Sequence, residues 1–286
     1  MALAILLTVV SAIAVNWAYV REHDAAASLP ALSLRRPLRS ARILIRDRAW
    51  LTAFAIETVG FLAFVAALAL APLALVTALA AGGIAVLAFL TSRMAGVRLE
   101  RRELVGVFAA VAGLALLGVS LAGGSDQGTR GSWLAILLWI AVSALVVAAA
   151  LRFGPRLVGG GAAYGVGAGV LFAAGDVTTE TVTHGGARLA FLPALFAAYG
   201  LGTGVLQLGF QRGGALTTAG TATLLTNALP ILAGSTLYAE EVPTGALGVV
   251  RGFAFGLVVV GGVLLARERM AAKPEAESTP ADAALV

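Results

Sequence analysis

The sequence predicts an all-α polytopic membrane protein with about nine transmembrane helices in two inverted repeats. Hydrophobic residues make up 59% of the 286 residues and charged residues only 12%. About nine nearly uncharged runs of about 18–23 residues fill most of the chain, and a helix needs about 20 apolar residues to cross a bilayer. A soluble protein of this length could not hide so much apolar surface from water.

The apolar runs define the predicted spans in chain order. They cover approximately residues 2–20, 49–70, 73–92, 104–121, 132–151, 159–181, 190–210, 216–238 and 245–266. A secretory signal begins with a positively charged segment, and residues 1–20 carry no charge, so we interpret them as a retained span. Residues 267–286 are polar and rich in Ala, Glu and Pro, which predicts a disordered cytoplasmic tail.

The positions of Lys and Arg predict the orientation. With the N-terminus outside and the C-terminus in the cytoplasm, seventeen of the 20 basic residues fall in cytoplasmic connections or in the tail. Only Arg130, Arg188 and Arg251 fall on the outer side. This asymmetry follows the positive-inside rule and predicts a multi-pass protein of the plasma membrane. A re-entrant hairpin in place of one span is an alternative that the count leaves open.

The longest connection, residues 21–48, is strongly basic. Residues 38–48 place arginines on one side and Leu38, Ile43, Leu44 and Ile45 on the other. This pattern is typical of a short helix on the anionic lipids of the inner leaflet. A plain basic loop that fixes the topology fits equally well. Because the net charge of +5 resides in such connections, it does not indicate a nucleic-acid partner.

A weak internal repeat appears when the sequence is shifted by 143 residues. The shift matches Leu73 with Leu216, Ser92 with Ser235, Leu104 with Leu247, Gly113 with Gly256, Gly118 with Gly261 and Leu121 with Leu264. The first copy begins outside and the second inside, which predicts two inverted membrane repeats, 1–121 and 132–266. Inverted repeats are typical of secondary transporters, whose site lies between the halves near the membrane midplane.

Acidic residues inside the spans are the strongest functional signal. Glu57, Asp176 and Glu180 lie within predicted spans, where a charged side chain costs roughly 2.5–3.5 kcal/mol at the helix centre. Asp176 and Glu180 are four residues apart and share a helix face that His184 would extend. Since no cation is predicted deep in a span, these acids are expected to be protonated, solvated in a cavity, or neutralised by a cationic substrate. A protonated structural carboxyl is the alternative for Glu57.

Uncharged polar residues provide further candidates for the lining of a binding site. They are Asn16, Gln207, Thr221 and Asn227. Pro230 follows Asn227 by three residues and would free a backbone carbonyl near residue 226. The alternative is that the Thr hydroxyls bond back onto their own helices.

Small residues at every fourth position form two stripes, Gly161–Gly165–Gly169 and Gly248–Gly252–Gly256. Such stripes allow close helix packing. A smooth surface for sliding during transport is the alternative.

The chain lacks the motifs of several function classes. It has no cysteine, two histidines, no phosphate-binding loop and no Ser/His/Asp constellation. We therefore expect no enzymatic activity and no cofactor, and energy for transport would come from an ion or substrate gradient.

Residues 57–121 resemble the drug/metabolite transporter superfamily, of the EamA-like type. The resemblance rests on the Ala-Leu-Ala-Leu-Ala-Pro run at 67–72, the Gly-Val-Arg-Leu turn at 96–99, and Gly106 and Gly113 in the next span. The second half resembles it again at the Tyr-Ala-Glu-Glu turn, 238–241, whereas the first copy has Val97 and Arg98 where that Glu is expected.

The family implies ten spans, so one of the first two helices would be missing here. Nine spans, an early basic connection, and Glu57 followed by Gly60-Phe61 resemble the nine-span magnesium-permease (NIPA-like) branch.

These observations lead to three functional hypotheses. The first is a secondary transporter that moves a small cationic or neutral solute by alternating access, with Glu57 and Asp176 contacting substrate or a coupling proton. The second is a magnesium permease in which Glu57 and Asp176 bind the cation, because Mg²⁺ needs one or two carboxylates. The third is a membrane scaffold that transports nothing. A homodimer is left open.

Overall fold

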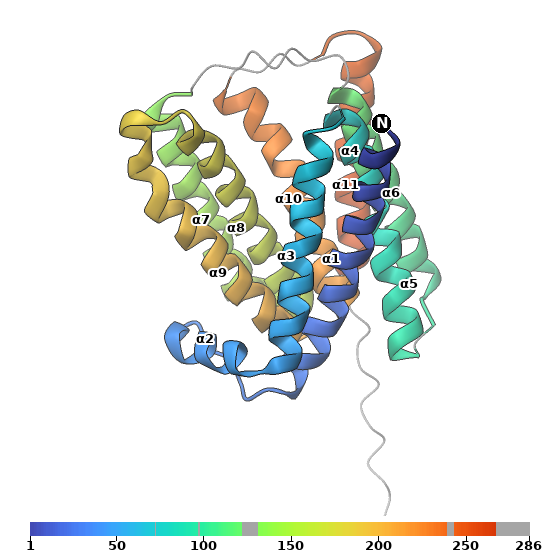
Figure 1. Ribbon diagram of the computed structural model, residues 1–286, viewed down its shortest axis with the longest axis vertical. Coiled ribbons are helices and arrows are strands. Elements are labelled where there is room, and N and C mark those ends of the chain that lie inside the picture. Colours follow the sequence, from blue (N-terminus) through green and yellow to red (C-terminus); the bar gives the residue numbers. More distant parts are fainter. Residues whose placement is uncertain (72, 97, 122–130, 239–242, 267–286) are drawn as a thin grey trace, which may run out of the picture.

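The computed structural model describes residues 1–71, 73–96, 98–121, 131–238 and 243–266, and none of them forms a β-strand. They form a bundle of long helices (Figure 1). Five features named above lie outside these residues: Pro72 of the Ala-Pro run, Val97, Arg130, residues 239–241 of the acidic turn and the tail 267–286.

The helices follow one another through short connections. They are α1 (Ala2–Ser28), α2 (Pro37–Arg46), α3 (Arg48–Leu68), α4 (Leu73–Ala80), α5 (Gly83–Ala95), α6 (Arg101–Ser120), α7 (Trp133–Leu157), α8 (Gly160–Thr183), α9 (Leu192–Phe210), α10 (Ala215–Leu237) and α11 (Ala246–Ala266), with a 3₁₀ helix, η2 (Gly186–Phe191), before α9.

Eight helical stretches within the described residues are long and apolar enough to cross a membrane. The chain is therefore a multi-pass helical membrane protein. The glycine-rich α8 has 24 residues and carries Asp176 and Glu180, but it is not among those eight.

Three helices differ from the predicted spans. The first continues two turns beyond residue 20, to Ser28, because the charged residues after Val20 remain helical. The predicted span 73–92 is divided at Ala81 and Gly82, between α4 and α5. In contrast, α7 continues through Pro155 to Leu157.

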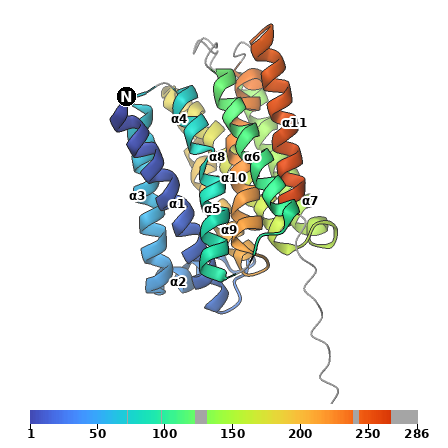
Figure 2. The same ribbon diagram turned by 90° about the vertical axis from the view of Figure 1, so that its right-hand side faces the viewer.

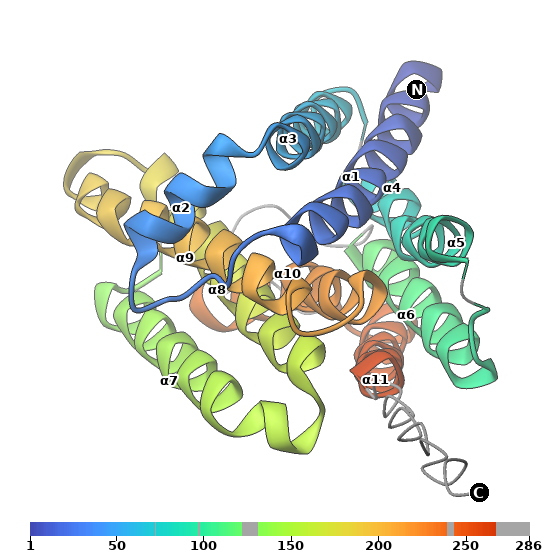
Figure 3. The same ribbon diagram turned by 90° about the horizontal axis from the view of Figure 1, so that it is seen from below.

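Helix α10 lies in the middle of the bundle and contacts α1, α5, α6, α8, α9 and α11 (Figure 3). The closest pairs are α1 with α3, α6 with α11, and α8 with α9 and α10. Figure 2 shows α1 and α3 on one side of the bundle and α11 on the other. The main core contains buried aliphatic residues from both halves, such as Leu87, Leu117, Leu206 and Leu224.

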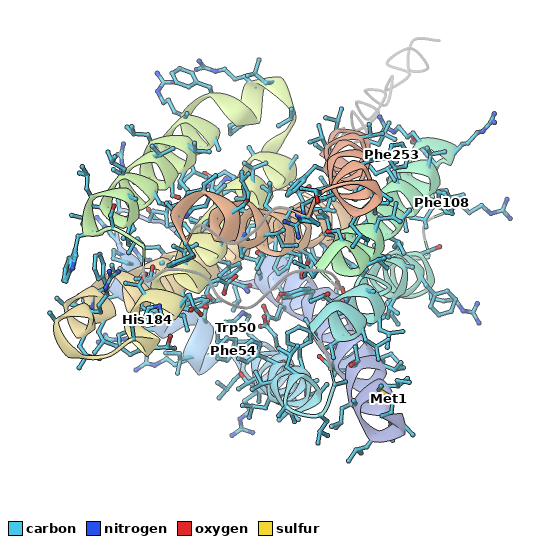
Figure 4. The ribbon with its side chains drawn as sticks, turned by 90° about the horizontal axis from the view of Figure 1, so that it is seen from above. Met1, Trp50, Phe54, Phe108, His184 and Phe253 are labelled. Carbon is cyan, nitrogen blue, oxygen red and sulfur yellow. The ribbon has the colours of Figure 1, made fainter. Side chains whose placement is uncertain are left out.

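The outer faces of the helices are apolar. Phe108 of α6 and Phe253 of α11 are 76% and 62% exposed and point away from the bundle (Figure 4). Leu134 and Leu145 of α7 are similarly exposed. Large side chains of this kind would be unfavourable in water, and they fit a surface that faces lipid.

The two glycine stripes have different surroundings. A Cβ at Gly165 or Gly169 would lie 2.5 Å from the Thr218 carbonyl or 2.7 Å from the Ala222 carbonyl, so α8 and α10 pack backbone to backbone there. Nothing lies within 4 Å of such a Cβ at Gly252 or Gly256. The packing interpretation therefore holds for the stripe on α8. Helix α11 instead packs against α6 at other residues, such as Gly261, which lies against Ala110.

Candidate functional site

Helices α1 and α3 meet along a seam of small residues. On α1 one row of buried residues recurs every three, four or seven positions: Ala4, Thr8, Ser11, Ala18, Glu22 and Ala25. On α3 the buried small residues are Ala53, Gly60 and Ala67. A Cβ at Gly60 would lie 2.9 Å from Val15 Cγ2, which shows how closely the two helices approach.

Two carboxyl groups lie together at this seam. Glu22 on α1 is fully buried, and Glu57 on α3 is partly buried. The Glu57 carboxyl interacts with the Glu22 carboxyl and with the Tyr19 hydroxyl. We refer to Glu22 and Glu57 as the carboxyl pair.

Gln207 on α9 completes the cluster from the second half of the chain. Its side chain is fully buried, and its Nε2 donates a hydrogen bond to Glu22 Oε2. The cluster therefore connects α1 and α3 of the first half to α9 of the second. Glu57 and Gln207 are both residues that the sequence analysis selected.

The carboxyl pair has no ion-pair partner among the residues that the structure describes. Two neighbouring carboxylates away from water repel each other strongly, so both are charged only if a cation lies with them. Otherwise the pair shares a proton. This arrangement can exchange a proton for a cation.

Two buried oxygens at the cluster have no hydrogen-bond partner within the described part of the chain: Glu22 Oε1 and Gln207 Oε1. Buried polar atoms are normally paired, and a carboxylate or amide oxygen can only accept. A proton shared with Glu57 can satisfy the Glu22 oxygen, and a ligand that takes its place must offer donors or positive charge.

The end of α9 closes the cluster on one side. Rings of Tyr19 and His23 contact the Phe210 ring, with centroids 6.5 and 5.8 Å apart. One residue further, Gln211 Nε2 donates to the Ala26 carbonyl at 2.9 Å, and Gln211 Oε1 accepts from the Leu32 amide at 2.9 Å. The segment after α1 is thus fastened to the end of α9.

Asp176 belongs to a different polar contact. Its Oδ1 accepts a hydrogen bond of 2.6 Å from the Tyr199 hydroxyl, between α8 and α9. No hydrogen bond or ion pair among the described residues joins Asp176 to Glu57. The described contacts thus place Glu57 with Glu22 and Asp176 with Tyr199.

The remaining predicted residues lie apart from the carboxyl pair. The Glu180 side chain is 58% exposed, and its Oε1 lies 3.7 Å from His184 Nε2. The amides of Asn16 and Asn227 donate back to Ala12 and Thr223 in their own helices. Asn227 is exposed.

Thr221 is buried on α10, and its hydroxyl has no partner within the described residues. Helix α10 continues past Pro230 to Leu237.

The structure also buries Arg251, one of the three basic residues that the sequence analysis assigned to the outer side of the membrane. Arg251 of α11 is 8% exposed, and its guanidinium donates to the Ser120 hydroxyl and carbonyl of α6, at 3.2 and 3.3 Å. Arg251 is the sixth residue of α11, so it lies near the start of the last predicted span.

Glu22 is the functional candidate that sequence reasoning missed. The charged run Arg21-Glu22-His23-Asp24 marked the end of the apolar stretch, and the helix was expected to stop there. Glu22 nevertheless lies four residues after Ala18 and eleven after Ser11, in phase with the buried seam. That phase is the signal that would have identified it.

Comparisons with known proteins identified no relative. No family model, no curated protein and no solved structure matches this chain. Within the described residues there is also no group of three or more His, Asp or Glu side chains placed to hold a metal.

Proposed function

We propose that this chain is a secondary transporter of the drug/metabolite type that moves a small cationic solute by alternating access. The observation that carries the proposal is the carboxyl pair at the junction of the two halves, with the amide of Gln207 beside it. Acidic side chains inside membrane-spanning helices are energetically costly, and in transporters they mark substrate and proton paths.

The helix pairing supports the proposed inverted repeats. In the shift of 143 residues, α3 corresponds to α9, α4 and α5 to α10, and α6 to α11. The contacts of α4 and α5 with α6 then match those of α10 with α11, and the α1–α3 pair has its equivalent in the α8–α9 pair if α1 is matched with α8 by its place in the fold. Of the long described helices, α7 is left without a counterpart in this matching, which fits a first half that is one helix short.

Polar contacts repeat with the helices. The α1–α3 pair contains Glu22 and Glu57, and the α8–α9 pair contains Asp176 and Tyr199. Position 57 corresponds to 200, next to Tyr199. Each half thus carries an acidic residue with a partner at a matching helix contact, as expected for two halves that rock about a shared site.

The same proposal sets the spans and the orientation. With α8 counted as a span beside the eight apolar stretches, the total is nine, the N-terminus is outside, and the C-terminus is cytoplasmic. The arginine-rich segment 35–48 then lies on the cytoplasmic side, together with the ends of α5 and α7 (Figure 1).

A divalent-cation permease is the second candidate function. Mg²⁺ keeps most of its water and needs one or two carboxylates, and Glu22 and Glu57 could supply them in place of the Glu57–Asp176 pair. The unpaired oxygens of Glu22 and Gln207 suit either a hydrated metal or an organic ammonium group. The scaffold hypothesis, in contrast, gives the carboxyl pair only a structural role.

Transport into proteoliposomes tests the proposal. The wild-type protein should accumulate one or more members of a panel of organic cations and Mg²⁺ under an imposed pH or substrate gradient. Glu22→Gln and Glu57→Gln should reduce the rate to that of empty liposomes. Asp24→Asn is the matched control, because Asp24 lies on α1 two residues from Glu22 but is exposed, and it should keep the wild-type rate. Equal rates in the wild type and both Gln variants would contradict the proposal.

A further inference from the structure

We propose that helix α2 is a docking surface for the headgroups of anionic lipids. Helix α2 is separate from the transport site, and it crosses the end of the bundle instead of running along it (Figures 1 and 3). The ends of α1 and α3 flank it, so it lies at the level where spans leave the hydrocarbon core.

One side of α2 is fixed to the bundle. Leu44 is buried, and Ile43 packs beside it against a cluster that includes Trp50 of α3 and Leu208 of α9. Trp50 in turn stacks on Phe54, with ring centroids 5.0 Å apart (Figure 4). This anchor sets the rotation of α2 about its axis.

A second side of α2 is apolar and uncovered. Leu38 and Ile45 are 85% and 61% exposed. They are seven residues apart, two helical turns, and so lie on the same face. Isolated leucines on a surface are common, but a helix that presents two of them beside an apolar bundle resembles the buried face of an interfacial helix.

The third side is cationic. Arg39, Arg42 and Arg46 follow one another at spacings of three and four, and all are exposed. Arg35, Arg36 and Arg48 extend the charge, and no acidic residue occurs between Asp24 and Asp47. Because arginine binds phosphate with several donors at once, this side fits a phosphate-bearing anionic headgroup.

The exposed sides of α2 therefore fit a partner that is apolar beside the bundle and anionic at the bundle's end. An anionic lipid leaflet has both properties: its acyl chains would cover Leu38 and Ile45, and its headgroups would meet the arginines. A protein partner or a second copy of this chain would cover the same leucines without the phosphate charge, and the experiment below separates these cases.

Spin labelling in vesicles tests the inference. The chain contains no cysteine, so Leu38→Cys and Ile45→Cys each give a single labelled site. In vesicles of phosphatidylcholine with phosphatidylglycerol, both nitroxides should be accessible to oxygen and shielded from an aqueous nickel chelate. In phosphatidylcholine alone, the shielding should decrease.

Charge variants identify the side chains responsible. Combining Arg39→Gln, Arg42→Gln and Arg46→Gln with each label should remove the effect of phosphatidylglycerol, whereas Arg152→Gln with Arg156→Gln, at exposed positions of α7, should keep it. An unchanged melting temperature confirms that each variant is folded. Free access of the nickel chelate in both lipids, an effect that survives the triple change, or dipolar coupling between labels of two copies would each overturn the inference.

Discussion

Gln207 on α9 donates its side-chain amide hydrogen to the carboxyl group of Glu22 on α1, across 185 positions of sequence. The contact joins the two halves of the bundle at the same point where Glu22 meets Glu57. If the halves move relative to each other during transport, this hydrogen bond must break or turn with them. Occupancy of the carboxyl pair and the position of the halves are therefore coupled in the proposed mechanism.

Replacing Gln207 by Leu should weaken the binding of the transported cation. The change removes the unpaired Oε1 acceptor that the cation would contact; a hydrogen bond with a charged partner is worth about 1.5–3 kcal/mol, which corresponds to about 10–100-fold in the dissociation constant. Isothermal titration calorimetry of the purified protein measures it. Leu206→Met, a volume-conserving change at the neighbouring buried position, is the control and should leave the affinity as it is. Equal affinities in all three proteins would remove Gln207 from the site.

The carboxyl pair should show strong energetic coupling. In a double-mutant cycle on the free energy of unfolding, Glu22→Gln and Glu57→Gln should deviate from additivity by about 0.5–3 kcal/mol, as residues in contact do. Glu57→Gln and Asp176→Asn should add within about 0.5 kcal/mol, because their contacts are separate. Coupling in the second cycle and additivity in the first would show that Glu57 acts with Asp176 and not with Glu22.

The glycines of α8 and α11 should respond differently to a methyl group. Gly165→Ala would place its Cβ against the Thr218 carbonyl, and we expect a loss of about 1–3 kcal/mol from overpacking. Gly252→Ala meets nothing within 4 Å and should gain up to about 1 kcal/mol from helix propensity. Melting temperatures in detergent should therefore move in opposite directions. A fall of equal size in both variants would mean that the stripe on α11 is also packed.

Fold class could be predicted from the sequence because a bilayer imposes a length and a composition on every span. The break between α4 and α5 could not be predicted from hydropathy, because Ala81, Gly82 and Gly83 are apolar or neutral and do not interrupt the apolar run. The ends of the helices were predicted less well than their presence. Helix α1 continues past its charged residues because Glu22 is buried against α3 and α9 and is not in water.

Part of the site was also predictable. Glu57 and Gln207 could be selected because each is polar within an apolar run. Their partners depend on which helices meet in space, and one sequence does not contain that information. The contacts of Asp176 with Tyr199 and of Arg251 with Ser120 could not be predicted for the same reason.

The central claim is that Glu22 and Glu57 together bind a cation, and a thermal-shift titration tests it most directly. Purified protein is melted against a series of organic ammonium compounds and divalent cations, in the wild type, Glu22→Gln, Glu57→Gln and the control Asp24→Asn. The account predicts that at least one cation raises the melting temperature of the wild type and of Asp24→Asn in a saturable way and has no effect on either Gln variant. The same shift in all four proteins, or none with any cation in the series, would contradict it.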